Sequence, residues 1–78
     1  WWVTRHGHAE PAIAAAIAEQ ARTLEQVIFA GFTHAPAARL CAALAEVLPP
    51  GLGRVFLTDN GSTAVEAGLK LALQWFHN

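Results

Sequence analysis

Apolar residues recur along the first third of the chain at the three- and four-residue spacing of an α-helix. The pattern starts at Glu10-Pro11, because a proline is well suited to the first turn of a helix. The apolar face that follows consists of Ile13, Ile17, Ala21, Leu24 and Ile28. Gly31 interrupts the pattern, so the spacing predicts a packing helix that ends before it.

A second helix is expected after Thr33-His34-Ala35-Pro36, which supplies a cap residue and an early proline. Pro49-Pro50-Gly51 ends this helix. Its apolar face consists of Leu40, Leu44, Val47 and Leu48. His34 is interpreted as a residue of the first turn, because the sequence offers no identifiable acid or base partner for a catalytic role.

A short strand and a third helix are predicted in the last third of the chain. Arg54-Val55-Phe56-Leu57 is apolar at three successive positions, as in a parallel strand that is covered on both faces. The helix after it is apolar nearly all round, which is typical of a helix between a sheet and a further layer. Its apolar residues are Val65, Leu69, Leu71, Ala72, Leu73, Trp75 and Phe76. The order of elements predicts part of an α/β domain.

The polar turn between this strand and the third helix has the features of an anion-binding site. Thr63 and Glu66 have the spacing of a capping box, and Ser62 is an alternative cap. Either cap leaves amide N–H groups and the positive end of the helix dipole facing the turn, and Gly61 permits close approach of a ligand. A phosphate would fit there. The alternative is a well-capped turn that binds no ligand.

The first residues, Trp1-Trp2-Val3-Thr4, are predicted to be extended, with a turn at Gly7. Adjacent tryptophans in a strand project to opposite faces, so one of them would meet a cavity or a ligand, unless both are core or interface residues. His6 and His8 could form a metal pair, but a structural zinc site needs about four ligands and no Cys/His cluster follows. We therefore predict no metal site.

Composition indicates that the 78 residues are a piece of a larger protein. Hydrophobic residues make up 54% and charged residues only 14%, against about 25% charged in typical soluble domains. Such a chain suits the interior of a large domain or a dimer interface. It also contains no Met, and it ends without a helix stop signal. We expect residues 1–78 to form a single partial domain.

Charge and cysteine usage exclude several classes of function. The net charge is −1 and the five basic residues are dispersed, which argues against nucleic-acid binding. No apolar run reaches the roughly 18 residues of a membrane span. Cys41 is the only cysteine, so an intrachain disulfide is excluded and a cytoplasmic location is expected. Lys70 is the only lysine, and its i,i+4 spacing from Glu66 predicts an ion pair rather than a Schiff-base nucleophile.

Four segments together resemble one group of enzymes along nearly the whole chain. They are Trp1-Trp2 with His6-Gly7-His8, residues 29–36, residues 59–66 and residues 71–75. The resemblance is to the class III pyridoxal-phosphate-dependent aminotransferases, and within them to the adenosylmethionine-8-amino-7-oxononanoate aminotransferases of biotin synthesis. The Gly-Ser turn is shared widely in the class, whereas the tryptophan pair indicates the subfamily.

The resemblance implies a fold-type-I pyridoxal-phosphate-dependent transferase that is a homodimer with active sites at the subunit interface. Residues 1–78 would be part of the N-terminal segment and the start of the large cofactor-binding domain. The reaction would move an amino group from S-adenosylmethionine to 8-amino-7-oxononanoate, giving 7,8-diaminononanoate. Gly61 and Ser62 would hold the phosphate of pyridoxal 5'-phosphate, Trp1 would contact the substrate, and Trp2 would form a second wall.

The resemblance places no catalytic residue within the chain. The Schiff-base lysine, the acidic partner of the pyridine nitrogen and the aromatic residue that stacks on the cofactor would all lie beyond Asn78, so the 78 residues alone are expected to be inactive. The amino donor, S-adenosylmethionine or lysine, stays open. Two alternatives also remain: another class III aminotransferase acting on an ω-amino substrate, and a non-catalytic interaction module.

Overall fold

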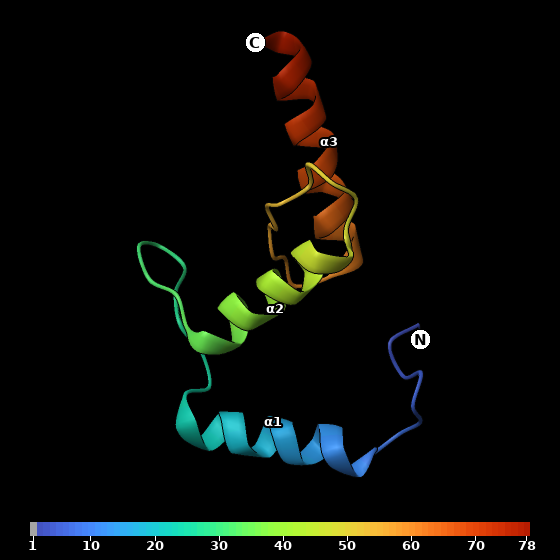
Figure 1. Ribbon diagram of the computed structural model, residues 1–78, viewed down its shortest axis with the longest axis vertical. Helices are drawn as coiled ribbons and strands as arrows, with labels where there is room; N and C mark the ends of the chain where they lie inside the picture. The colour runs from blue at the N-terminus through green and yellow to red at the C-terminus, as the bar shows by residue number, and fades with distance from the viewer. Residues whose placement is uncertain (1) are drawn as a thin grey trace. The chain divides into compact units, whose positions relative to one another are not determined.

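The computed structural model describes residues 2–78, which form three helices joined by irregular segments (Figure 1). Helix α1 spans Pro11–Thr23, α2 spans Ala35–Val47 and α3 spans Gly61–His77. The chain divides into two compact units, Trp1–Ala37 and Ala38–Asn78. All three predicted helices are therefore present, and the prediction of a helix-rich chain is confirmed.

Helix α1 begins where the sequence predicted. The carboxylate of Glu10 caps it by accepting the amide hydrogen of Ile13 at 2.9 Å, and Pro11 is the first helical residue. Proline has no N–H group to leave unsatisfied at that position, and a capping carboxylate lies at the favourable, positive end of the helix dipole. The start of α1 is thus determined by two adjacent residues.

The end of α1 comes earlier than predicted. Leu24 is already extended, with φ −165° and ψ 105°, so the expected continuation of the apolar face through Leu24 and Ile28 is wrong. The Thr23 hydroxyl donates to the carbonyl of Glu19 at 3.0 Å, and the Gln20 side-chain amide donates to the carbonyl of Leu24 at 2.9 Å. These local bonds replace the next helical turn.

Helix α2 is capped by His34, which the sequence analysis had placed in the first turn of the helix. The ring Nδ1 of His34 accepts the amide hydrogen of Ala37 at 3.3 Å, and the helix begins at the residue after His34. Pro36 lies in the first turn, as predicted. At the other end, the last turn closes with the Leu48 amide donating to the Leu44 carbonyl at 3.0 Å, directly before the prolines. The predicted end of this helix is confirmed.

The structure contains no strand within residues 2–78, so the predicted central strand at residues 54–57 is wrong there. Figure 1 draws this segment as an irregular path before α3. Phe56 is 74% exposed. A parallel strand needs a neighbouring strand to satisfy its N–H and C=O groups, and these residues supply none. The extended start is also wrong, because Trp2 has a left-handed backbone with φ 66°.

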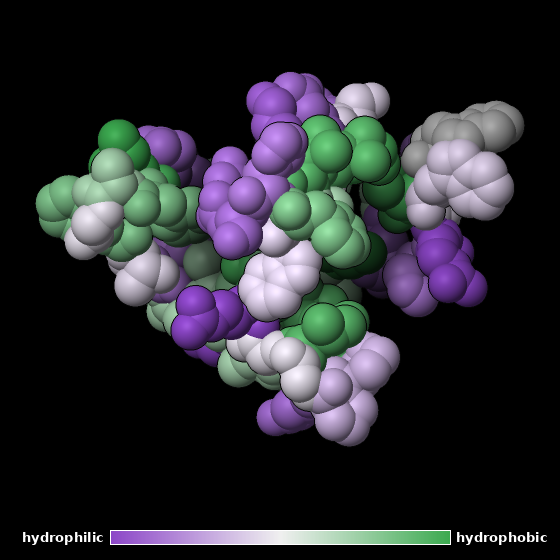
Figure 2. All heavy atoms as spheres, turned by 90° about the horizontal axis from the view of Figure 1, so that it is seen from above, coloured by the Kyte–Doolittle hydropathy of each residue, from purple (hydrophilic) through white to green (hydrophobic). Residues whose placement is uncertain are grey.

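Large apolar side chains of the described residues are mostly exposed. Ala37 is the only buried hydrophobic residue in that part of the chain. On α3, Val65 is 65% exposed and Phe76 is 86% exposed. Figure 2 shows apolar residues open to view on the surface. The helices therefore follow from local sequence patterns rather than from a shared core, and no helix within residues 2–78 has the length and hydropathy to cross a bilayer.

Candidate functional site

The turn before α3 is closed by a reciprocal pair of hydrogen bonds. The side-chain oxygen of Asn60 accepts the amide hydrogen of Thr63 at 2.9 Å, and the Thr63 hydroxyl accepts the amide hydrogen of Asn60 at 3.3 Å. Asn60 is therefore the N-cap and Thr63 is the third helical residue. The predicted caps, Thr63 with Glu66 or Ser62 alone, are wrong. Asparagine is among the strongest N-cap residues, and that preference was the signal the sequence analysis missed.

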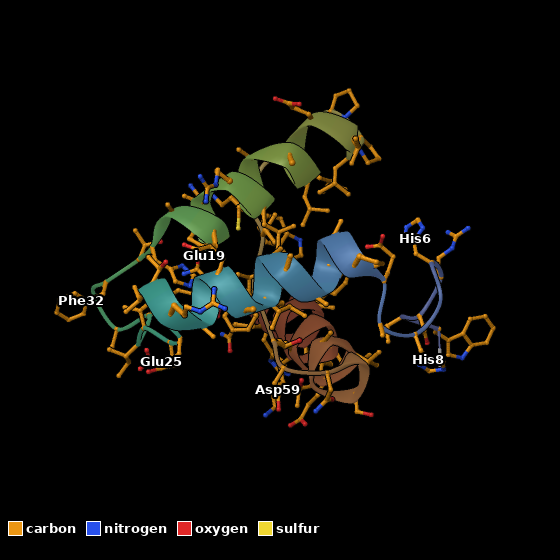
Figure 3. All side chains as sticks on the ribbon, turned by 90° about the horizontal axis from the view of Figure 1, so that it is seen from below. His6, His8, Glu19, Glu25, Phe32 and Asp59 are labelled. Atoms are coloured by element: carbon orange, nitrogen blue, oxygen red, sulfur yellow. The ribbon has the colours of Figure 1, made fainter. Side chains whose placement is uncertain are left out.

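Two further hydroxyl contacts brace the same turn. The Thr58 hydroxyl donates to the carbonyl of Asn60 at 3.1 Å. The Thr63 hydroxyl lies 2.9 Å from Oδ1 of Asp59 and 3.0 Å from the carbonyl of Asn60. A hydroxyl has one hydrogen to donate, and an ionised carboxylate is the stronger acceptor, so Asp59 takes it. Figure 3 shows Asp59 on the segment that leads into α3.

Because Asn60 is the N-cap, Gly61 and Ser62 are the first two residues of α3. Their amide N–H groups have no hydrogen-bond partner among residues 2–78, whereas the amides of Thr63 and Ala64 both bond to Asn60. Both residues are exposed. Two unpaired amides, the Ser62 hydroxyl and the positive end of the helix dipole thus meet at one place, which is the donor set that an anion requires.

The space beside Gly61 is open. A Cβ atom added at Gly61 would meet no atom within 4 Å, and the residue does not have a positive φ. Nothing in the chain itself therefore requires glycine there. The nearby carboxylate of Asp59 is the one group of the turn that would oppose an anion, although its Oδ1 is engaged by Thr63. The donors at this turn therefore fit a phosphate group.

The predicted substrate-binding residues belong to the other compact unit. Trp1 lies outside the described residues. Trp2 is 84% exposed and borders a surface hollow together with Thr4 and Arg5. A contact of Trp1 or Trp2 with substrate stays a prediction.

The turn before α1 is formed as the sequence predicted. Gly7 has φ 89°, and its amide donates to the carbonyl of Thr4 at 3.4 Å. His6 lies within this turn and His8 follows it, and Figure 3 shows the two histidines at separate places on the segment before α1. A hollow of about 200 Å³ lies beside His6, with Ile13 and Ile17 of α1 in its lining. Residues 2–78 contain no cluster of three or more side chains that could ligate a metal.

Lys70 forms the ion pair with Glu66 that the sequence predicted. Its Nζ lies 2.8 Å from Oε1 of Glu66, and the two side chains are 74% and 64% exposed. An exposed ammonium in an i,i+4 ion pair is not desolvated, so it lacks the environment that activates a lysine as a nucleophile.

Comparison with known proteins gives consistent matches along the chain. The family model described as "Aminotransferase class-III" matches residues 1–78. Three relatives carry the name "Adenosylmethionine-8-amino-7-oxononanoate aminotransferase". The protein from Synechococcus elongatus is 63% identical over 78 residues, that from Mycobacterium leprae is 41% identical over 78 residues, and that from Geobacter sulfurreducens is 47% identical over 77 residues.

These matches cover 97% to 100% of the chain but only 17% to 18% of each relative. The chain thus spans less than a fifth of the length of the relatives it matches. No solved structure matches the chain.

Proposed function

The chain belongs to the class-III aminotransferase family, which has the fold of the pyridoxal-phosphate-dependent transferases, and from this membership we propose that it is a segment of a 7,8-diaminononanoate synthase. The whole enzyme would transfer an amino group from S-adenosylmethionine to 8-amino-7-oxononanoate in biotin biosynthesis. We propose further that it is a cytoplasmic homodimer. The exposed apolar residues of α3 are available for burial against other parts of such an assembly.

One observation carries this proposal: 63% identity over all 78 residues to the Synechococcus elongatus relative, whose name states the reaction. Relatives from Mycobacterium leprae and Geobacter sulfurreducens carry the same name at 41% and 47% identity. A generic class III member acting on another ω-amino substrate is the first alternative. The tryptophan pair at the start of the chain favours the oxononanoate enzyme, since an indole suits the aliphatic chain of that substrate.

The N-terminus of α3 would hold the phosphate of pyridoxal 5'-phosphate. The amides of Gly61 and Ser62 would donate to the phosphate oxygens, and the Ser62 hydroxyl would add a third donor. Asn60 and Thr63 keep the turn closed without using these donors. When bound, the cofactor supplies an electron sink for the carbon that carries the amino group. The role of Gly61 and Ser62 is to bind and orient it.

In this proposal, no residue of the chain takes part in the proton transfers of the reaction, which would be carried out by groups elsewhere in the enzyme. Lys70 is its only lysine, and it is exposed and paired with Glu66. The lysine that holds the cofactor covalently would therefore lie outside residues 1–78, as would the general base. Trp1 and Trp2 would line the substrate pocket and exclude water from it.

The test uses the full-length protein purified with pyridoxal 5'-phosphate. Incubation with S-adenosylmethionine and 8-amino-7-oxononanoate should yield 7,8-diaminononanoate, detected by mass spectrometry. Lysine in place of S-adenosylmethionine identifies the donor, and a panel of ω-amino acids tests the other class III activity. Turnover of ω-amino acids without turnover of the oxononanoate would reject the proposed substrate. Absence of any transamination, with no bound cofactor, would favour a non-catalytic interaction module.

A further inference from the structure

His34 is placed so that its ring nitrogen controls the start of α2. Its Nδ1 accepts the amide hydrogen of Ala37 at 3.3 Å, and Ala37 is the third residue of the helix. An amide at this position has no partner within its own helix, so it depends on a capping side chain or on water. Ala37 is also the buried hydrophobic residue of the described chain, at 9% exposure. Water is therefore a poor substitute for the imidazole.

The bond requires one protonation state of His34. Nδ1 accepts only when it carries no hydrogen, which places the proton of the neutral ring on Nε2. A protonated imidazole has a hydrogen on both nitrogens and cannot accept. It would also place a positive charge at the positive end of the α2 dipole. Imidazole is the side chain that in general changes charge between about pH 5 and 8.

The same ring also contacts the segment before α2. The ring centroids of Phe29 and His34 lie 5.6 Å apart at an interplanar angle of 76°, an edge-to-face arrangement. Gly31 lies between these residues with φ 85°, and it allows the chain to reverse there. His34 thus fixes both the first turn of α2 and the segment that leads into it.

No charged group among residues 2–78 competes for this imidazole. The described partners of His34 are the Ala37 amide and the Phe29 ring, neither of which titrates. The ion pairs in that part of the chain lie within α1 and within α3. Arg39, the nearest charged residue along α2, is exposed and would oppose a second positive charge rather than stabilise it.

We propose that His34 is a pH-sensitive latch on the N-terminus of α2. The neutral ring closes the helix and holds the Phe29 segment. Acid protonates Nδ1 and breaks the bond to Ala37, which opens the first turn of α2. The device depends on the cap geometry alone and is independent of the reaction proposed above.

The test is hydrogen exchange on the full-length holoenzyme between pH 5.5 and pH 8, with rates corrected for intrinsic exchange. Protection of the Ala37 amide should fall about tenfold from the neutral to the acidic end, the value of one lost hydrogen bond of about 1.4 kcal/mol. In His34→Asn, a side chain that caps without titrating, protection should be the same at both ends. The matched control is His8→Asn, because His8 is an exposed histidine in the segment before α1. In this variant, protection of the Ala37 amide should still fall about tenfold at acidic pH.

Two results of the exchange experiment would overturn the proposal: protection that is independent of pH in the unmodified protein, or a fall in protection that persists in His34→Asn. If that variant does not fold, ¹⁵N spectra of the imidazole decide without any substitution. At neutral pH the Nδ1 resonance should be that of an unprotonated acceptor nitrogen and should move on acidification. A protonated Nδ1 at neutral pH would equally reject the latch.

Discussion

The side-chain oxygen of Asn60 accepts the amide of Thr63 at 2.9 Å, while the Thr63 hydroxyl accepts the amide of Asn60 at 3.3 Å. This reciprocal pair determines which residue opens α3, and it therefore determines that the unpaired amides are those of Gly61 and Ser62. The predicted capping of the helix by Thr63 or Ser62 would have shifted the available donors further along the chain. The candidate phosphate site thus depends on a cap formed before it.

Asn60→Ala should weaken the N-terminus of α3. Loss of the cap is expected to cost about 0.5–2 kcal/mol of unfolding free energy, measured by denaturant unfolding of the full-length protein. Asn60→Asp is the matched variant, because its carboxylate still caps the helix but adds a negative charge beside the proposed phosphate. It should retain stability and lose cofactor affinity. Equal cofactor affinity in Asn60→Asp and the unmodified protein would argue against an anion at this turn.

Ser62→Ala should weaken retention of pyridoxal 5'-phosphate by about 1–3 kcal/mol, which is roughly 5- to 150-fold in Kd, because a charge-assisted hydrogen bond is lost. The measurement is cofactor titration of the full-length apoenzyme, followed by absorbance. Thr58→Ala serves as the control, since the Thr58 hydroxyl bonds to the carbonyl of Asn60 and has no role in the donor set. Unchanged affinity in Ser62→Ala would remove Ser62 from the site.

Gly61→Ala separates stability from binding. An added Cβ meets no atom of the chain within 4 Å, and the backbone is not left-handed, so the helix should be unaffected or stabilised by about 0.4–1 kcal/mol. The methyl group would, however, occupy the space through which a phosphate approaches the amide. Thermal unfolding of the apoprotein and cofactor titration measure the two effects. Cofactor affinity equal to that of the unmodified protein would show that no ligand approaches Gly61 closely.

Trp1→Ala in the full-length enzyme should lower kcat/KM for 8-amino-7-oxononanoate by about tenfold or more, because a contact of about 1.5–3 kcal/mol with the aliphatic chain would be lost. Trp1→Phe should retain more of the activity, since it keeps an apolar aromatic wall. The half-reaction with the amino donor should change less. Unaltered KM and kcat for the oxononanoate substrate would exclude Trp1 from the pocket.

Lys70→Ala should leave cofactor attachment intact. The Glu66–Lys70 pair is exposed, so its loss should cost no more than about 0.5 kcal/mol. After borohydride reduction of the full-length enzyme, peptide mapping should find the cofactor on a lysine outside residues 1–78. Consistent with that, the isolated 78-residue chain should not turn over the amino donor. Labelling of Lys70 would identify it as the lysine that binds the cofactor and would contradict its role as a structural ion-pair partner.

The helices could be predicted from local sequence because their causes are local. Pro11 at the start of α1 and the prolines after α2 restrict the backbone directly. The i,i+4 pair of Glu66 and Lys70 likewise needs only the helix that carries it. The caps were less predictable, because several polar residues at each start compete for the same amide. In the structure, the side chain of Asn60 rather than that of Ser62 is the N-cap of α3.

The sequence alone determined the three helices and the turn at Gly7, whereas the hydrogen bonds of Asn60 decided that Gly61 and Ser62 are the first two residues of α3. Only tertiary structure decides whether residues 54–57 pair as a strand, because the partner groups of a strand come from other segments of the chain. In this structure those partners do not reach residues 54–57, and Phe56 stays exposed. Local hydrogen bonds can close a helix within a few residues, whereas a sheet and its core require contacts between distant residues.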